Sequence, residues 1–384
     1  MIDIKEKSNC CGCEACVSIC PQKCISMKED DEGFRYPVVD KEKCIDCGLC
    51  ENTCPILKKC ENKHLLNKSE FLAAYNKDDY ILKNSSSGGI FWIIAQYFFE
   101  HKGIVYGVIQ ENTYSVKFIR ATNVTEAEKI RGSKYLQAKI NNIYIKVKND
   151  LEKDKLVLFS GTPCQIAALY KFLKKDYSNL FTIDVVCHGV PSNKVYKKYI
   201  DYVEKTKKHK VTNIKWRDKK DGKWGPNKIT LYFDDGTTRT TISRENPFQV
   251  GFLENLYLRP SCYTCKYAAL PRIADISLAD FWGYDKEFLE KNNNKGISIV
   301  IISTIKGKDL INKLNDKMNT HRVEEEYVKS KSRHVYIHPL ENSKREEFFK
   351  DLDVISFKKI SKKYKMRNGE IVKFLKKVKR KILK

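Results

Sequence analysis

The chain has no apolar run long enough to cross a membrane. The longest, IFWIIAQYFF, covers residues 90–99 and is interrupted by Gln96, whereas a membrane-spanning helix needs about 20 consecutive apolar residues. No apolar signal-peptide core follows Met1 either, and such a core marks secreted proteins. These two absences predict a soluble, cytoplasmic protein.

Acidic residues are scarce relative to basic ones. The sequence has 48 Asp and Glu against 72 Lys and Arg, a formal net charge of +24, which suits nucleic acid, a membrane surface or small anions as partners. The interleaved basic and aromatic residues of an RNA-binding module are missing. We therefore expect no specific nucleic-acid partner.

About half of the net charge lies in residues 358–384, which contain thirteen Lys and Arg and one Glu. The end of this segment, IVKFLKKVKRKILK, places five apolar side chains on one helical face: Ile371, Phe374, Leu375, Val378 and Ile382. A basic amphipathic tail of this kind can contact an anionic membrane surface or an acidic partner protein. An ordinary surface helix with a frayed charged end fits the pattern equally well.

Fifteen cysteines are an odd number, and their spacing is not that of a disulfide framework. The pattern C-x2-C-x2-C-x3-C-P occurs twice, 34 residues apart, so two half-domains related by a pseudo-twofold axis are predicted. In this pattern each triplet holds one [4Fe-4S] cluster, and the fourth cysteine reaches across to the other cluster. The predicted ligands are Cys10, Cys13, Cys16 and Cys54 for the first cluster and Cys44, Cys47, Cys50 and Cys20 for the second.

Zinc is the alternative metal for this segment, but zinc sites favour two CxxC pairs and histidine ligands. Cys11, Cys24 and Cys60 lie outside the repeated pattern, and we expect them to be bystanders. Residues 1–60 thus resemble a bacterial-type two-cluster ferredoxin domain, which transfers single electrons.

The polar segment from Lys58 to Ser69 is the expected linker to a second domain at residues 70–350. Strand-like and helix-like runs alternate there, which indicates an α/β sheet with crossover helices, and an antiparallel meander follows between residues 213 and 242. The predicted fold is an α+β ferredoxin-like two-cluster domain followed by an α/β flavin-binding domain with an antiparallel insertion. The expected helices cover residues 89–101, 142–151, 194–207 and a segment beginning at residue 164.

Two short motifs of the second domain suit a phosphate-containing ligand. NSSSGGIF, residues 84–91, precedes an apolar helix whose free N–H groups could cradle a phosphate, although ordinary helix capping explains it too. RGSKYLQ, residues 131–137, adds two cations, a hydroxyl and an aromatic ring, although a surface turn has the same composition.

Four further cysteines occur in GTPCQ, DVVCHGVPS and SCYTCKYA. Cys164 and Cys187 each follow a predicted parallel strand, where α/β sheets gather ligand-binding residues, and Cys262 and Cys265 form a CxxC. One shared site is expected. A catalytic thiol at Cys164 paired with His188 is an alternative, but it leaves the CxxC unexplained.

The order SSSGG, GSKY, GTPCQ, CHGVPS, CxxC and ADISLADFWG behind a two-cluster domain resembles the coenzyme F420 hydrogenase/dehydrogenase β-subunit family of iron-sulfur flavoproteins. The resemblance implies FAD, and a third [4Fe-4S] cluster held by Cys164, Cys187, Cys262 and Cys265. It makes His188 a candidate proton donor, and gives Asp275 and Asp280 the task of orienting a ligand or a basic neighbour. The implied flavin contacts are Ser86, Ser87, Gly88, Gly89, Arg131, Ser133, Lys134 and Tyr135.

The function that this resemblance implies is an oxidoreductase that passes electrons between the ferredoxin-type clusters and, through FAD, coenzyme F420 or another small organic substrate. A redox partner protein or ferredoxin would exchange electrons with it. The alternative is a non-catalytic electron-transfer subunit of a larger redox or polysaccharide-biosynthesis system. The Lys-, Asn- and Ile-rich sequence suggests an AT-rich bacterial genome, which argues mildly against F420 as the substrate.

Overall fold

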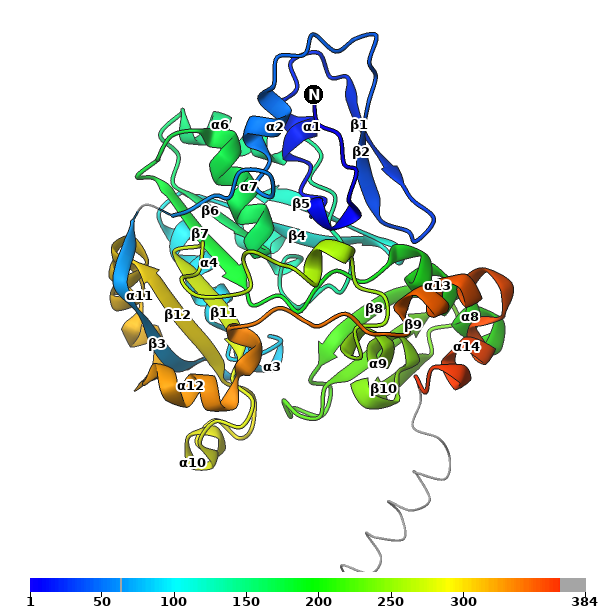
Figure 1. The fold of residues 1–384 in the computed structure, drawn as a ribbon. Coiled ribbons are helices and arrows are strands. Elements are labelled where there is room, and N and C mark those ends of the chain that lie inside the picture. Colours follow the sequence, from blue (N-terminus) through cyan, green and yellow to red (C-terminus); the bar gives the residue numbers. More distant parts are fainter. Residues whose placement is uncertain (63, 367–384) are drawn as a thin grey trace, which may run out of the picture.

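The structure is a computed structural model that describes residues 1–62 and 64–366 (Figure 1). The helix predicted between residues 371 and 384 lies outside the described residues. Among the described residues, no helix combines the length and apolarity that a membrane span requires.

The N-terminal region, blue in Figure 1, is a small two-layer unit at one end of the molecule. Its regular elements are η1 (Lys7–Asn9), α1 (Ala15–Ile19), α2 (Leu49–Thr53) and the antiparallel hairpin of β1 (Ile25–Glu29) and β2 (Arg35–Val39). The sequence repeat is also a backbone repeat. Gly12 and Asp46, 34 residues apart, both have positive φ, and so do Glu14 and Gly48, the N-caps of α1 and α2.

The second region is built on an eight-stranded sheet of order β13-β3-β12-β11-β7-β6-β4-β5. Its central strands β11, β7, β6 and β4 run parallel, and the other pairs are antiparallel. The strands are β3 (Leu65–Asn76), β4 (Ile104–Asn112), β5 (Ser115–Ala121), β6 (Val157–Gly161), β7 (Leu180–Val185), β11 (Ile276–Asp280), β12 (Ser298–Thr304) and β13 (Met318–Val323).

Helices cover both faces of this sheet. On one face, α6 (Ile143–Leu151) and α7 (Pro163–Leu173) share an apolar core with the ferredoxin region, and α1 and α2 both contact α7. On the other face, α4 (Ile90–Glu100) and α11 (Ile305–Lys313) pack on the strands. Burial on both faces explains the continuous apolar run of residues 299–302 in β12, which is buried along its whole length.

The antiparallel insertion is confirmed as a separate sheet of β8 (Val211–Asp218), β9 (Lys228–Phe233) and β10 (Thr238–Ile242). Its core includes α8 (Asn193–Lys207), α9 (Pro247–Leu253), α13 (Arg345–Val354) and α14 (Phe357–Lys363), which surround it in Figure 1. The remaining helical elements are α3 (Asp79–Lys83), α5 (Val124–Glu128), α10 (Lys286–Glu290), α12 (Glu325–Lys331), η2 (Ser243–Glu245), η3 (Pro260–Cys262), η4 (Asn315–Lys317) and η5 (Arg333–Val335).

The expected α/β sheet is present, and it is mixed, since β3, β12, β13 and β5 pair antiparallel with their neighbours. One expectation needs correction. β3 begins at Leu65, inside the segment expected to be a linker. The polar residues there misled the prediction because Asn67 and Lys68 are exposed although the strand pairs with its neighbour, Leu65 with Thr304.

Candidate redox site

The predicted ligands of the first cluster come together from both halves of the repeat. Cys10, Cys13, Cys16 and Cys54 are all buried. Burial, together with the neighbouring thiols Cys10 and Cys54, holds the pKa of Cys16 well above its ordinary value. Since metal binding requires thiolates, cluster assembly here must displace protons from these sulfurs.

The predicted ligands of the second cluster, Cys20, Cys44, Cys47 and Cys50, line one pocket. Cys47 is exposed, whereas Cys50 is buried. Cys24, predicted to be a bystander, lines the same pocket, and its sulfur is 3.4 Å from that of Cys20. This contact, with burial, raises the pKa of Cys24 to about 11.

The four cysteines of the second domain, Cys164, Cys187, Cys262 and Cys265, also lie close together. Cys187 and Cys262 are joined by backbone: Pro191 and Leu258 form an antiparallel bridge, and the Val190 N–H donates to the Cys262 sulfur at 3.4 Å. Burial, and then the thiols of Cys262, Cys164 and Cys265, raise the pKa of Cys187 well above its ordinary value. β6 and β7 are parallel neighbours, as predicted, so Cys164 and Cys187 emerge at the same edge of the sheet.

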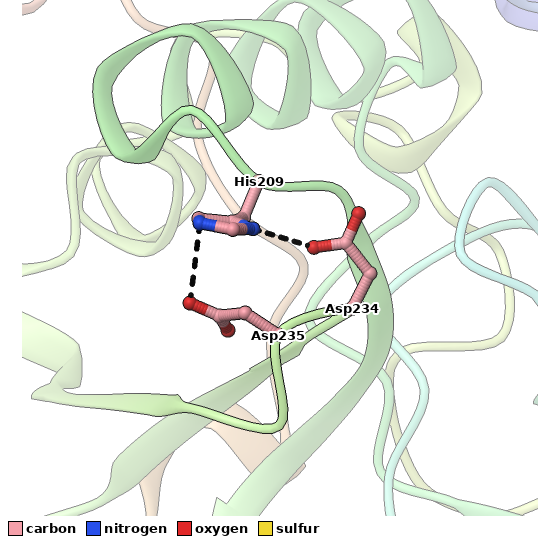
Figure 2. A group of neighbouring side chains, drawn as sticks. All are labelled: His209, Asp234 and Asp235. Atoms are coloured by element: carbon pink, nitrogen blue, oxygen red, sulfur yellow. Dashed lines mark hydrogen bonds and ion pairs between the residues drawn. The ribbon is translucent and has the colours of Figure 1, made fainter.

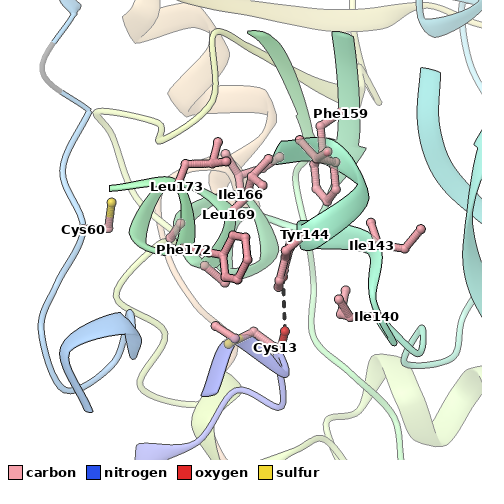
Figure 3. Packing of buried hydrophobic residues seen from close by; sticks show 14 of the residues in the cluster. Cys13, Cys60, Ile140, Ile143, Tyr144, Phe159, Ile166, Leu169, Phe172 and Leu173 are labelled. Carbon is pink, nitrogen blue, oxygen red and sulfur yellow. Dashed lines mark hydrogen bonds between the residues drawn. The ribbon is translucent and has the colours of Figure 1, made fainter. Parts of the chain in front are cut away.

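Cys11 connects this third set of cysteines to the first. Its thiol interacts with the thiols of both Cys13 and Cys164. Close by, the Tyr144 hydroxyl donates to the carbonyls of Cys13, at 3.1 Å, and of Gln165, at 3.3 Å; the first bond is dashed in Figure 3. Cys11 therefore lies at the contact between the ferredoxin region and α7, a position that the repeat pattern could not reveal.

The two motifs predicted to bind a phosphate are in contact. The backbone N–H of Ser133 donates to the Ser86 hydroxyl at 3.0 Å, and the Arg217 guanidinium donates to the Ser86 carbonyl at 3.3 Å. Gly89 has φ +78° and is the N-cap of α4, and a Cβ on Gly88 would lie 2.3 Å from the Ala74 carbonyl oxygen. The loop therefore packs so tightly on the sheet that only glycine fits there.

Buried donors without partners mark the same region. Nε and Nη2 of Arg131 and Nε of Arg217 have no hydrogen-bond partner among the described residues, although buried polar groups are nearly always satisfied. Arg131 also lies over the Trp92 ring, 4.6 Å from its centroid. An anionic group such as the pyrophosphate of FAD fits these unpaired guanidinium donors.

Other predicted flavin contacts face protein groups. The Lys134 ammonium donates to the carbonyls of Lys129, Ile130 and Arg131, and burial lowers its pKa to about 7. Tyr135 packs against Trp216 and Phe252, and the Ser87 hydroxyl donates to the Ile297 carbonyl at 2.8 Å.

His188 is half-buried beside the third cysteine set. One ring nitrogen lies 2.8 Å from Oδ1 of Asn255, and the ring packs edge-on against Phe252. Burial lowers its pKa, so the imidazole is neutral at pH 7. These contacts hold the ring in place.

The two aspartates of ADISLADFWG differ in role. Asp280 makes a two-pronged ion pair with Arg217, at 2.5 and 2.6 Å, as expected for a carboxylate that orients a basic neighbour. Asp275 instead accepts hydrogen bonds from Thr182 and Thr304 inside the sheet. The sequence reasoning missed Arg217, because one arginine in a Lys-rich sequence gives no sign of being buried.

A separate surface cluster of His209, Asp234 and Asp235 has three ligand-type atoms within 4.8 Å of one another (Figure 2). His209 bonds to both carboxylates, at 2.9 and 3.4 Å, and both aspartates are exposed. The side chains satisfy each other as an ordinary surface ion-pair group.

Comparison with known proteins agrees with this arrangement. Residues 154–326 match the family model for the C terminus of the beta subunit of coenzyme F420 hydrogenase/dehydrogenase, and residues 9–56 match the 4Fe-4S dicluster domain. The chain thus combines a domain of the F420 hydrogenase/dehydrogenase beta-subunit family with an N-terminal 4Fe-4S dicluster domain. Its dicluster domain implies two [4Fe-4S] clusters, and electron transfer is the shared activity of such domains.

Three relatives illustrate the two parts of the chain. The F subunit of F(420)H(2) dehydrogenase from Methanosarcina mazei is 26% identical over 170 residues, 41% of this chain and 47% of the relative. An uncharacterized protein of Methanocaldococcus jannaschii is 26% identical over 201 residues, 45% of this chain and 55% of the relative. Subunit I 2 of NADH-quinone oxidoreductase from Geobacter metallireducens is 35% identical over 81 residues, 20% of this chain and 57% of the relative.

The chain thus spans about half the length of the curated relatives it matches. A solved structure of the F420-reducing [NiFe] hydrogenase complex from Methanosarcina barkeri also matches, with 20% identity and a TM-score of 0.48, over 72% of this chain and 91% of that one.

Proposed function

We propose that this chain is an iron-sulfur flavoprotein oxidoreductase in which the ferredoxin clusters, a third [4Fe-4S] cluster and FAD connect a one-electron partner to a small organic substrate. The observation that carries the proposal is the convergence of Cys164, Cys187, Cys262 and Cys265 beside the first set of cluster cysteines. These four residues come from three separate segments, namely the start of α7, the turn after β7 and the end of η3 with the residues after it, and a set of four thiols is the usual ligand set of a [4Fe-4S] cluster.

The order of the sites supports electron transfer through the chain. The second pocket contains the exposed Cys47, the first set is buried, and Cys11 links the first set to Cys164. Clusters held by these cysteines would therefore form a series from the exposed pocket to the interior, and such clusters would supply one-electron transfer along it. A redox partner protein or a ferredoxin is the expected donor or acceptor at the exposed end.

FAD would supply the exchange between single electrons and electron pairs. The residues proposed to hold its phosphates are Ser86, Ser133 and Arg131, since they combine two touching hydroxyl-bearing loops with unpaired buried guanidinium donors. Asp280 holds Arg217 against the same loop. His188, neutral at pH 7, is the proposed proton donor or acceptor for the substrate.

Coenzyme F420 is one candidate substrate, because the family and the Methanosarcina mazei relative carry its name. Another reducible organic molecule is the alternative. Turnover of F420 or of a viologen dye by the isolated chain would support an enzyme. A chain that binds its clusters but turns over neither would favour a non-catalytic electron-transfer subunit of a larger complex.

The decisive test is the anaerobic content of iron, acid-labile sulfide and flavin in the purified chain. We expect about twelve irons, four for each of three cubanes, and one FAD. A Cys164→Ser, Cys262→Ser double variant should fall to about eight irons, whereas Cys60→Ser, a control outside every predicted ligand set, should keep the full content. About eight irons in all three proteins would refute the third cluster.

A further inference from the structure

Arg259 is a fully buried cation at the junction of the two regions, with 0% of its surface exposed. It is the N-cap residue of η3, which ends at Cys262, and its carbonyl accepts the Cys262 N–H at 2.8 Å. Its side chain points the other way, into the ferredoxin region. Nε donates to the Cys10 carbonyl at 2.6 Å, and Nη2 lies 3.4 Å from the Cys10 sulfur.

The rest of the guanidinium is held by neutral groups. It donates to the Arg35 carbonyl at 2.9 Å and to the Gln137 side-chain oxygen at 3.2 Å. The Tyr36 ring lies below it, 4.3 Å from centroid to Cζ, and the Phe34 ring lies 5.7 Å away. In the part of the chain that the structure describes, Arg259 has no carboxylate partner.

A buried cation without a counter-charge is costly, because burial removes its hydration. The ionisable groups that act on Arg259 are Cys10, Tyr36, Cys11 and Cys262, and the thiols among them belong to or adjoin predicted ligand sets. A thiolate-bound cluster at Cys10 would supply the missing negative charge. The buried arginine is therefore explained by an anionic cluster beside it.

The second cluster pocket lacks such a cation. Its fourteen lining residues include Asp46 but no lysine or arginine. Two positive groups beside it are each paired with a carboxylate: the amino terminus of Met1 lies 2.8 Å from Asp46, and the Lys43 ammonium, which acts on Cys24, lies 3.0 Å from Asp40. The two halves of the repeat thus differ electrostatically. A buried positive charge stabilises the reduced form of a cluster, because that form carries one more negative charge, and it therefore raises the reduction potential. Hydrogen bonds to the sulfur ligands also raise the reduction potential.

We propose that Arg259 is a positioning residue that raises the reduction potential of the first cluster above that of the second, so that electrons arriving at the exposed pocket move inward. The proposal rests on the ligand assignment in the proposed function. According to this proposal, the two similar halves of the repeat differ in function. The cluster of the second half would accept electrons from the partner, and the cluster of the first half would pass them toward Cys164 and Cys262.

The test is a redox titration of the whole chain with dithionite, under anaerobic conditions, followed by electron paramagnetic resonance. In the unmodified chain, the signal perturbed by Cys10→Ser should have a higher potential than the signal perturbed by Cys47→Ser. The reverse order would overturn the proposal, and this measurement needs no variant of Arg259. Iron content separates the two levels of inference: a chain without iron at the first set refutes the ligand assignment itself.

Three variants test the cause. Arg259→Met should lower the reduction potential of the first cluster. The decrease should change the ratio of electrons on the two clusters at least tenfold, and a tenfold change corresponds to about 59 mV for a one-electron couple. Arg259→Lys, which keeps the charge, should change it less. Lys266→Met removes an exposed cation that acts on Cys54 and should have the smallest effect because solvent screens it. Equal shifts in the Met and Lys variants at position 259 would show that charge is not the cause.

Discussion

Gly12 is the residue whose replacement tests most directly how the ferredoxin region docks. Its φ of +66° is left-handed, and a Cβ there would lie 2.4 Å from Nε2 of Gln137 and 2.9 Å from Nη1 of Arg259. The Gln137 amide donates to the carbonyls of Cys11 and Gly12, at 3.0 and 3.1 Å. An alanine at position 12 would therefore displace a side chain that joins the two regions.

A second glycine of the ferredoxin region serves as the control. Gly48 is not the repeat counterpart of Gly12, but it has nearly the same conformation, with φ +69°, and a Cβ there would meet nothing closer than 3.9 Å. Gly48→Ala should therefore cost only the left-handed strain, about 1–2 kcal/mol. Gly12→Ala adds the loss of the two Gln137 hydrogen bonds, each about 0.5–1.5 kcal/mol, for a total of about 2–5 kcal/mol.

The assay is anaerobic denaturant unfolding of the cluster-loaded chain, followed by loss of cluster absorbance for both variants. The effect of Gly→Ala on the unfolded chain is the same at the two positions, so it cancels in the comparison. We expect Gly12→Ala to unfold at a clearly lower denaturant concentration than Gly48→Ala. Midpoints that correspond to stabilities within about 0.5 kcal/mol of each other would refute the tight contact as the reason for glycine.

Two further predictions concern the second domain. Asp280→Asn should destabilise the chain by about 3–5 kcal/mol, because it leaves the buried Arg217 without its charge partner. The midpoint of denaturant unfolding measures this loss. The control Glu346→Gln, which removes a charge from an exposed ion pair, should leave the midpoint unchanged. His188 has a pKa lowered by burial from 6.5, so the unfolded state binds the proton first and stability should fall as pH drops through 6.5. His188→Gln should lose less stability between pH 7.5 and 5.5 than the unmodified chain. An identical loss would show that His188 does not cause this pH dependence.

The cysteine spacing predicted most of the candidate site because it is local. Three thiols in C-x2-C-x2-C lie within two turns of backbone, so the tight turns that form each half can be read from the sequence. The Cys-Pro that ends each half supplied the cross-ligand, and the structure brings Cys54 to Cys10 and Cys16. The strands before Cys164 and Cys187 were equally readable, since buried parallel strands are continuous apolar runs.

Sequence patterns are less informative where polar residues are paired inside the fold. They predict a linker at the start of β3 because its polar residues look solvated, and Asn67 and Lys68 are indeed exposed although the strand is paired. They do not give the direction of the antiparallel strands, since periodicity indicates a strand but not its direction. They also do not show that Cys24, expected to be a bystander, lies against Cys20.

By itself the sequence determined which residues are available to the candidate site: two repeated cysteine sets, four further cysteines in three segments, and two loops suited to a phosphate. Tertiary structure alone decided how these parts are joined. Cys11 meets Cys164 across 153 positions of the chain, and Arg259 places its charge against Cys10 from the loop that carries Cys262. Such contacts depend on how separate elements pack, and no local pattern of residues specifies them.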